Sequence, residues 1–349
     1  MLNRILLAAA VLAAPAVAQA VRTVPVGFEK KWGGVPFYHW ASAAGRTMQV
    51  VDNSNTTPFA AIKQLSFRRH NAVSSGTPGT ADVEVTMSQA NWGMLDTRFA
   101  EQEKATNAKV VCKMKQINLP DWTAMPKDMS FDFPIKFDAP WVYLGRGLPG
   151  TEALVWTVRY KNSTAGTHVL DRAFGAYKYT AGTVIGSGCS GYSHYLRFWN
   201  TGPHSANDGM HMEVAGASGP KSSPTLMFFD LKDAQMTVPG LCSTLHALPV
   251  VVFPVGGTDA MGVLSHRYLQ LPYIQGIEGW TIFTQLLSLD TTQTGLPFSV
   301  SNANTLTIPA NASVKGDSAC YAWAQGVGAT TAIGNFWFFS GAPVTELSQ

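Results

Sequence analysis

Apolar and polar residues alternate one by one along several segments of this chain, which is the pattern of a β-strand with one buried and one solvent-facing side. Residues 81–87 alternate Val and Met with Asp, Glu and Thr, and residues 129–138 alternate Phe and Ile with Asp and Lys. Residues 154–161 alternate Leu, Trp, Val and Tyr with Thr, Arg and Lys. Turns rich in Gly, Pro, Ser and Thr separate these segments. The pattern predicts an all-β fold of the sandwich or jelly-roll type.

The length of the chain, 349 residues, exceeds that of most single domains. The turn-rich segment TAGTVIGSGCSG, residues 180–191, is the clearest boundary. We therefore expect one β-sandwich or jelly-roll domain over residues 21–180 and a second over residues 185–309. Residues 310–349 include the aromatic run FWFF, so we expect this C-terminal segment to pack back on the body. The one expected helix covers residues 91–105.

The first twenty residues have the layout of an export signal. Asn3 and Arg4 precede an apolar run over residues 5–14, and small residues follow it, as at a signal-peptidase site. This run is about half the roughly 20 residues that span a bilayer, and no later stretch is long enough. We expect residues 1–20 to be a signal peptide and the mature protein to be secreted, periplasmic or on the cell surface, with no membrane span.

Four cysteines fit an oxidising compartment, and no CxxC spacing suggests a metal site instead. Cys189 and Cys242 flank one run of predicted strands, so we expect a disulfide between them. Cys112 and Cys320 would then form a second bridge, tying the C-terminal segment to the first half.

Charged residues make up 13% of the chain, about half the usual share, and the net charge is only +3. This balance, with basic patches no larger than RRH at residues 68–70, does not predict nucleic acid as a partner. No cofactor is predicted, and a structural calcium ion bound by loop carboxylates is an open alternative. The loop carboxylates are Asp128, Asp132, Asp230, Asp233 and Asp259.

The residues closest to a metal-binding set are His204, Asp208, His211 and Glu213. Imidazole and carboxylate groups so near in sequence suit zinc or copper. His211 and Glu213, however, share the polar side of a predicted strand over residues 210–214, which favours an ordinary solvent-facing surface. We therefore predict no metal site.

A β-sandwich can also host a glycoside hydrolase, which places two carboxyl groups on either side of a sugar bond. Asp82 and Glu84 share one strand side about 7 Å apart, and Glu213 lies on another strand. Their alternation with core residues indicates solvated surface. A secreted carbohydrate-active enzyme using Asp and Glu is the alternative function, and a metal-dependent hydrolase is the third.

Aromatic residues gather near the mature N-terminus, in KKWGGVPFYHWAS at residues 30–42. Rings with polar edges stack on sugars or anchor partners, and the competing interpretation is that they close one end of the sandwich. We predict a secreted non-enzymatic binding or surface protein, acting in glycan binding, adhesion or extracellular assembly. Its partners would be extracellular polysaccharide or cell-surface components, and Trp32 and Trp40 are the predicted ligand-binding residues.

Several short sequences occur in a fixed order along the chain: LSFRRH, VEVTMS, GSGC, PGLC, GWTIFTQLLSLD and LPFSVSNANTLTIP. In this order, with Gln285 ahead of Asp290 and then Ser301-Asn302, the chain resembles a group of uncharacterised secreted proteins common in planctomycetes and related environmental bacteria. The resemblance covers most of the mature chain and implies export and a two-part β layout. It implies no activity or site residue. The aromatic segment after Pro309 departs from the group's pattern.

Overall fold

The computed structural model describes residues 21–40, 44–53, 60–72, 76–92, 94–96, 98–104, 107–126, 128–145, 153–173, 180–200, 210–271, 274–310, 319–329 and 342–349. Within these ranges the regular secondary structure is almost entirely β-strand, as predicted. The expected helix over residues 91–105 is wrong. Its described part forms the strand β6 (Met94–Asp96) and the four-residue helix α1 (Phe99–Gln102). Residues 94–96 cannot be helical because they pair as a strand with residues 267–269. The expected signal peptide, residues 1–20, lies outside the described residues.

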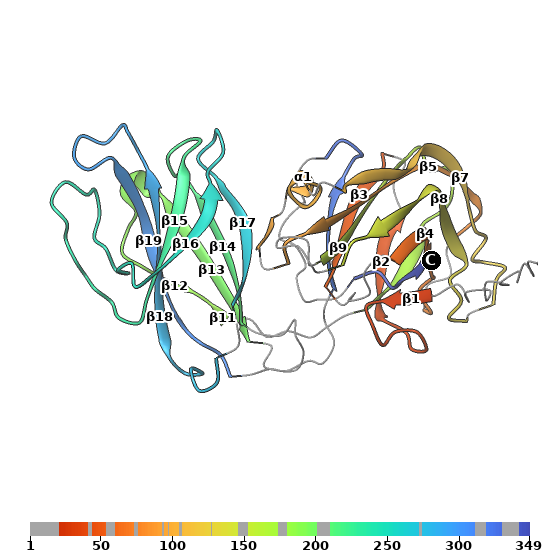
Figure 1. The fold of residues 1–349 in the computed structure, drawn as a ribbon, viewed down its shortest axis with the longest axis horizontal. Helices are drawn as coiled ribbons and strands as arrows, with labels where there is room; N and C mark the ends of the chain where they lie inside the picture. The colour runs from red at the N-terminus through yellow and green to blue at the C-terminus, as the bar shows by residue number, and fades with distance from the viewer. Residues whose placement is uncertain are drawn as a thin grey trace, which may run out of the picture.

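Three sheets form the first group of strands (Figure 1). One has the order β20-β3-β9-β5-β7, one β1-β21-β4-β8 and one β10-β2. The strands of the first sheet are β20 (Ala319–Gln325), β3 (Arg46–Asp52), β9 (Ala153–Lys161), β5 (Gly79–Ala90) and β7 (Lys109–Leu119). The others are β1 (Val21–Val24), β21 (Thr345–Ser348), β4 (Ala60–Phe67), β8 (Phe133–Tyr143), β10 (His168–Ala173) and β2 (Gly34–Trp40).

These three sheets enclose one hydrophobic core, and the alternating segments of the sequence supply it. Val83, Val85 and Met87 of β5 are fully buried there, as their alternation predicts. β21 pairs with β1 on one side and β4 on the other, so the last strand of the chain lies inside its sheet. Figure 1 accordingly places the C-terminus beside β1 and β4.

Two five-stranded sheets form the second group, around a separate core that includes Met212, Val214, Met227 and Leu286. Their orders are β11-β13-β14-β17-β6 and β12-β19-β18-β15-β16. The first contains β11 (Thr180–Ala181), β13 (Ser193–Asn200), β14 (Met210–Ala217) and β17 (Leu264–Leu271). The second contains β12 (Thr183–Ile185), β19 (Phe298–Thr307), β18 (Thr281–Leu289), β15 (Pro224–Asp230) and β16 (Val251–Gly257).

The strand β6 joins the two groups, because it precedes α1 in the first half of the chain but pairs with β17 of the second group. Asp96 of β6 forms ion pairs with Arg98 and with Arg267 of β17. Trp199 and Tyr268 of the second group share a buried apolar cluster with residues of the first, among them Cys320. The groups are therefore connected by a strand pairing, an ion pair and apolar contacts.

One of the two expected disulfides is present. Cys189 and Cys242 are bonded, as predicted, with their Cα atoms 5.4 Å apart. The bridge between Cys112 and Cys320 is wrong, because both are buried free thiols. Cys112 lies on β7 and Cys320 on β20, the opposite edges of one sheet. Four strand spacings of about 4.8 Å separate such strands, whereas a disulfide needs Cα atoms within roughly 7 Å.

None of the helices in the described ranges is both long and apolar enough to cross a membrane.

Candidate functional site: the Trp32 hollow

The two tryptophans predicted to bind ligand occupy different environments. Trp40, on β2, is completely buried. Its ring packs 4.6 Å from that of Tyr160 and 5.2 Å from that of Phe133, centroid to centroid. Trp40 as a ligand-binding residue is therefore wrong, because strand alternation turns its side chain into the core. Trp32 precedes β2 and remains partly exposed.

Trp32 lines a surface hollow of about 370 Å³. Glu29, Lys30, Asp128 and Met129 line it together with Trp32. The residues come from two segments far apart in sequence, the turn before β2 and the loop before β8. An aromatic ring, an aliphatic side chain and three charged groups thus meet at one place on the surface. We call this place the Trp32 hollow.

A buried ion pair supports the segment that carries Trp32. Arg68 and Asp171 are both fully buried, and Arg68 Nη2 lies 2.7 Å from Asp171 Oδ2. Arg68 also donates to the carbonyl oxygens of Phe28 (2.8 Å) and Lys31 (2.5 Å). The backbone N–H of Gly33 donates to both carboxylate oxygens of Asp171, at 3.0 and 2.9 Å. Residues on both sides of Trp32 are thus held by one ion pair.

Arg68 also contacts the ring of Trp32 itself. Its guanidinium carbon lies 5.4 Å from the ring centroid, within the range of a cation–π contact. Gly33 is required beside it, because a Cβ at this position would lie 2.2 Å from the carbonyl oxygen of Arg172. Arg68 therefore packs against the Trp32 ring, and the backbone on both sides of Trp32 is fixed. This order in the free protein lowers the conformational entropy lost when a ligand binds.

The carboxylates of the Trp32 hollow are positioned by their own turns. Glu29 Oε1 accepts the backbone N–H of Gly27 at 3.1 Å. Asp128 Oδ1 accepts the hydroxyl and the backbone N–H of Ser130, which lowers the pKa of Asp128 below its usual value. Asp128 is therefore ionised at neutral pH and presents a fixed acceptor. Carboxylates of this kind hydrogen-bond to sugar hydroxyls, and a tryptophan ring covers the apolar side of a sugar.

The strand side that carries His211 and Glu213 is not solvent-facing, contrary to expectation. Both residues of β14 are buried, with 3% and 1% of their surface exposed. Their partners on the neighbouring strands, Trp199 and Tyr268, belong to the buried apolar cluster shared with the first group of strands, so this side of the sheet faces that group. Burial lowers the pKa of His211 to about 3, so His211 is neutral across the physiological range.

Glu213 is the centre of a polar cluster that crosses three strands. Its Oε1 accepts His266 Nδ1 at 2.6 Å and the hydroxyl of Tyr268 at 2.7 Å. Its Oε2 lies 3.4 Å from Nη1 of Arg197. Burial first, and then the charge of Glu213, raise the pKa of Tyr268 well above its usual value. Glu213 thus ties β13, β14 and β17 together by side-chain contacts, in addition to the backbone ladder.

The remaining members of the weak metal set, His204 and Asp208, lie outside the described residues. Within the described ranges, no three His, Cys, Asp or Glu side chains are grouped as a metal would need. Asp82 and Glu84, the candidate catalytic acids, engage Asn162 (2.7 Å) and Arg159 (3.6 Å).

Most of the candidate calcium ligands accept hydrogen bonds from nearby backbone or side-chain groups. Asp230 and Asp259 accept backbone N–H groups, from Leu231 and Met261 respectively, and Asp233 accepts from His246. Asp132 accepts the indole N–H of Trp122 at 2.8 Å. These contacts explain the carboxylates without an ion.

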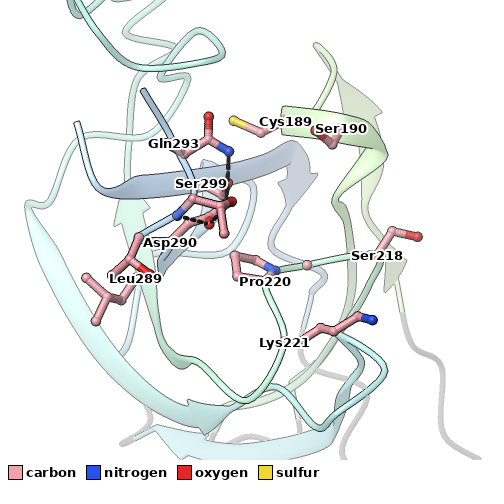
Figure 2. Close-up of a pocket in the computed structure, with 12 residues that line it drawn as sticks. Cys189, Ser190, Ser218, Pro220, Lys221, Leu289, Asp290, Gln293 and Ser299 are labelled. Atoms are coloured by element: carbon pink, nitrogen blue, oxygen red, sulfur yellow. Dashed lines mark hydrogen bonds between the residues drawn. The ribbon is translucent and has the colours of Figure 1, made fainter. Parts of the chain in front are cut away.

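A second hollow, of about 410 Å³, lies beside the Cys189–Cys242 bridge (Figure 2). Asp290 lies within it and accepts from Thr292, Gln293 and Ser299. Burial acts to raise the pKa of Asp290, but these hydrogen bonds outweigh it and lower the pKa below its usual value. The Asp290 carboxylate is already hydrogen-bonded by residues close to it in sequence. None of the residues that line this hollow is aromatic. The Trp32 hollow is therefore the better candidate for binding.

No protein-family model, curated protein or solved structure matches this chain.

Sequence reasoning found Trp32 but missed the residues that complete its site. Asp128 was considered only as a calcium ligand, and Glu29 and Lys30 carried no motif. The indication in the sequence was RRH at residues 68–70, since two arginines at the end of an apolar strand need buried partners. Which carboxylate pairs with Arg68 depends on β10 lying beside this segment, and no local pattern encodes that.

Proposed function

We propose that this chain is a secreted, non-enzymatic binding protein that holds an extracellular polysaccharide at the Trp32 hollow. The observation that carries the proposal is a partly exposed tryptophan, fixed in place by a buried ion pair and surrounded by hydrogen-bonding side chains. Binding sites for neutral, hydroxyl-rich ligands combine an aromatic surface with a few well-placed polar groups. The volume of about 370 Å³ falls in the range of small-molecule sites and suits one or two sugar rings.

The charges of the site favour a neutral or hydroxyl-rich sugar over a strongly acidic one. Glu29 and Asp128 bring two negative charges and Lys30 one positive charge. An acidic polysaccharide would meet repulsion from both carboxylates at short range. Export, which the proposal requires, is supported by the Cys189–Cys242 disulfide, because such bridges persist in oxidising compartments.

A glycan array identifies the ligand class. We expect the mature protein to bind neutral polysaccharides or their oligosaccharides, and Trp32→Ala to remove the signal. Binding of wild type and Trp32→Ala to the same glycans with equal strength would show that the site lies elsewhere.

A further inference from the structure

The pairing of β8 with β4 contains a large bulge. Ile62 pairs with Trp141 and Gln64 pairs with Lys136, so residues 137–140 of β8 lie opposite the single residue Lys63. Bulges bend a strand and re-aim its side chains, and they are frequent beside binding sites. A surface hollow of about 280 Å³ lies at this bulge, lined by residues 63–64 and 136–140. We call it the β8 hollow.

Two lysines of the β8 hollow carry positive charge that no carboxylate compensates. Lys63 and Lys136 both line the hollow, and both are exposed. Among the described residues, no Asp or Glu pairs with either of them. The one acidic residue of the hollow, Asp138, forms an ion pair with Lys115 of β7 and accepts the backbone N–H of Lys113 at 2.7 Å.

Asp138 thereby brings two further lysines to the same place, because β7 lies beside β8 (Figure 1). The hydrogen bond from Lys115 first, and then that from the N–H of Lys113, lower the pKa of Asp138 below its usual value. The positive charges of both lysines act on this carboxylate in the same direction. With Lys63 and Lys136, four lysines and one carboxylate give the hollow a local charge of +3, as large as the net charge of the whole chain.

We propose that the β8 hollow binds the carboxylate or sulfate groups of an acidic polysaccharide. Ammonium groups of lysine bind such oxyanions through charge-assisted hydrogen bonds, which are stronger than those between neutral groups. The ion pair with Lys115 holds Asp138 on the β7 side of the bulge, which leaves Lys63 and Lys136 to meet the anionic groups.

The spread of the lysines favours a polymer over a single small ion. Lys113 and Lys115 lie two positions apart on β7, which is about 7 Å along a strand. Lys63 and Lys136 lie on two other strands. A small ion can contact only some of these four ammonium groups, whereas a chain that carries a negative charge on each sugar can contact several at once.

The kind of polymer is argued from the lining of the hollow and from the proposed function. Phe137 is the only aromatic residue among those that line the hollow, and it is partly buried. Nucleic-acid bases would therefore find little surface on which to stack. The choice of a polysaccharide rests on the proposed extracellular function, while the choice of an oxyanion rests on the lysines alone. The Trp32 hollow, with its two carboxylates, takes a different class of ligand.

Calorimetric titration of the mature protein with oligogalacturonate tests the proposal. We expect binding at about 0.05 M salt that weakens at about 0.3 M salt, as for exposed charges. Lys63→Gln and Lys136→Gln should each weaken binding about threefold, and the double variant about tenfold. Asp138→Asn should strengthen it, because the variant removes the one negative charge of the hollow. All these side chains are exposed, so we expect the variants to fold.

Two controls locate the effect. Lys232→Gln removes an exposed lysine after β15, in the second group of strands, and should leave the affinity unchanged. Trp32→Ala should also leave binding of oligogalacturonate unchanged. Loss of neutral-glycan binding in wild type, with binding of oligogalacturonate retained, would therefore count against the proposed function alone.

Four results would overturn the inference about the β8 hollow. The first is the absence of binding to both oligogalacturonate and dextran sulfate at about 0.05 M salt. The second is wild-type affinity in the folded Lys63→Gln, Lys136→Gln double variant, and the third is an equal loss in Lys232→Gln. The fourth is tighter binding of sodium sulfate or single-stranded DNA than of either polysaccharide, which would identify a free ion or nucleic acid as the ligand.

Discussion

Arg68 and Asp171 come from β-segments 103 residues apart, and they meet in an ion pair with no exposed side-chain surface on either partner. Ion pairs from which water is excluded are costly to break from one side, because the remaining charge stays buried without compensation. Here the pair also holds the carbonyl groups of Phe28 and Lys31 and the N–H of Gly33. Its structural role is therefore coupled to the position of Trp32.

Replacing one member of this pair is expected to destabilise the whole first group of strands. Asp171→Asn leaves the Arg68 charge buried and should lower the free energy of unfolding by about 3–5 kcal/mol. Glu101→Gln, which removes the surface pairs with Lys104 and Arg98, should change it by less than about 1 kcal/mol. Urea unfolding followed by tryptophan fluorescence measures both. Equal effects of the two variants would contradict the role assigned to Arg68 and Asp171.

The thiol content distinguishes the structure from the sequence-based pairing. We expect two thiols per chain in guanidinium without reductant, from Cys112 and Cys320, and none that react in the native protein, because both are buried. Burial also raises the pKa of each thiol, which keeps it protonated and unreactive. A colorimetric thiol assay under both conditions gives the answer. Finding no thiol in the unfolded chain would restore the Cys112–Cys320 bridge.

Two buried histidines make stability depend on pH. Burial lowers the pKa of His194 to about 4 and that of His211 to about 3, from an ordinary value of 6.5. The unfolded chain therefore binds protons below pH 6.5 while the native chain does not, so stability is full above pH 6.5 and falls as the pH drops. The expected slope is about 1.4 kcal/mol per pH unit for each histidine between about pH 6 and pH 4.

Substitution isolates this effect from that of the carboxylates, which lose stability mainly below about pH 4. His194→Gln cannot take up a proton, and its amide can still reach the hydroxyl of Thr284, which lies 2.8 Å from Nε2 of His194. Unfolding curves at several pH values should show a slope reduced by about half. An unchanged slope would mean that His194 is not neutral in the native state.

The last strand contributes to stability out of proportion to its length. Deleting residues 345–349 removes β21, which lies between β1 and β4, and also removes the buried Leu347. We expect β1 to detach and trypsin to cleave near Arg22 in the native state. The second group of strands, with its own core, should keep its protection. Unchanged proteolysis of the truncated chain would contradict the pairing.

The sequence predicted strands well wherever apolar and polar residues alternate, although both sides of β9 are buried, including Val155 and Thr157. The alternation in residues 81–87 and 154–161 became β5 and β9. Alternation states which residues share a side but not what covers that side. His211 and Glu213 were therefore interpreted as wet surface, although they are buried on the side of the sheet where Trp199 and Tyr268 pack on the first group of strands.

The remaining features were harder to predict, because they depend on contacts between residues far apart in the sequence. Cys189 and Cys242 are brought together by neighbouring strands and their loops, so their pairing could be inferred from a single run of strands. Cys112 and Cys320 depended on the strand order of the whole sheet, which no local pattern encodes. The two predicted ligand-binding tryptophans also differ in their relation to a strand. Trp40 belongs to the alternation of β2, whereas Trp32 stands before the strand begins.

The most direct test of the account is calorimetric titration of the mature protein with an oligosaccharide of the class that the array identifies. Trp32→Ala is compared with Trp280→Ala, whose side chain is 49% exposed in the second group of strands. Trp32→Ala also removes the ring that packs on Arg68, so affinity is compared after circular dichroism has shown that both variants are folded. We predict that Trp32→Ala weakens binding at least tenfold, or about 1.4 kcal/mol, and that Trp280→Ala leaves it unchanged. Wild-type affinity in a folded Trp32→Ala variant would contradict the assignment of the Trp32 hollow as the binding site.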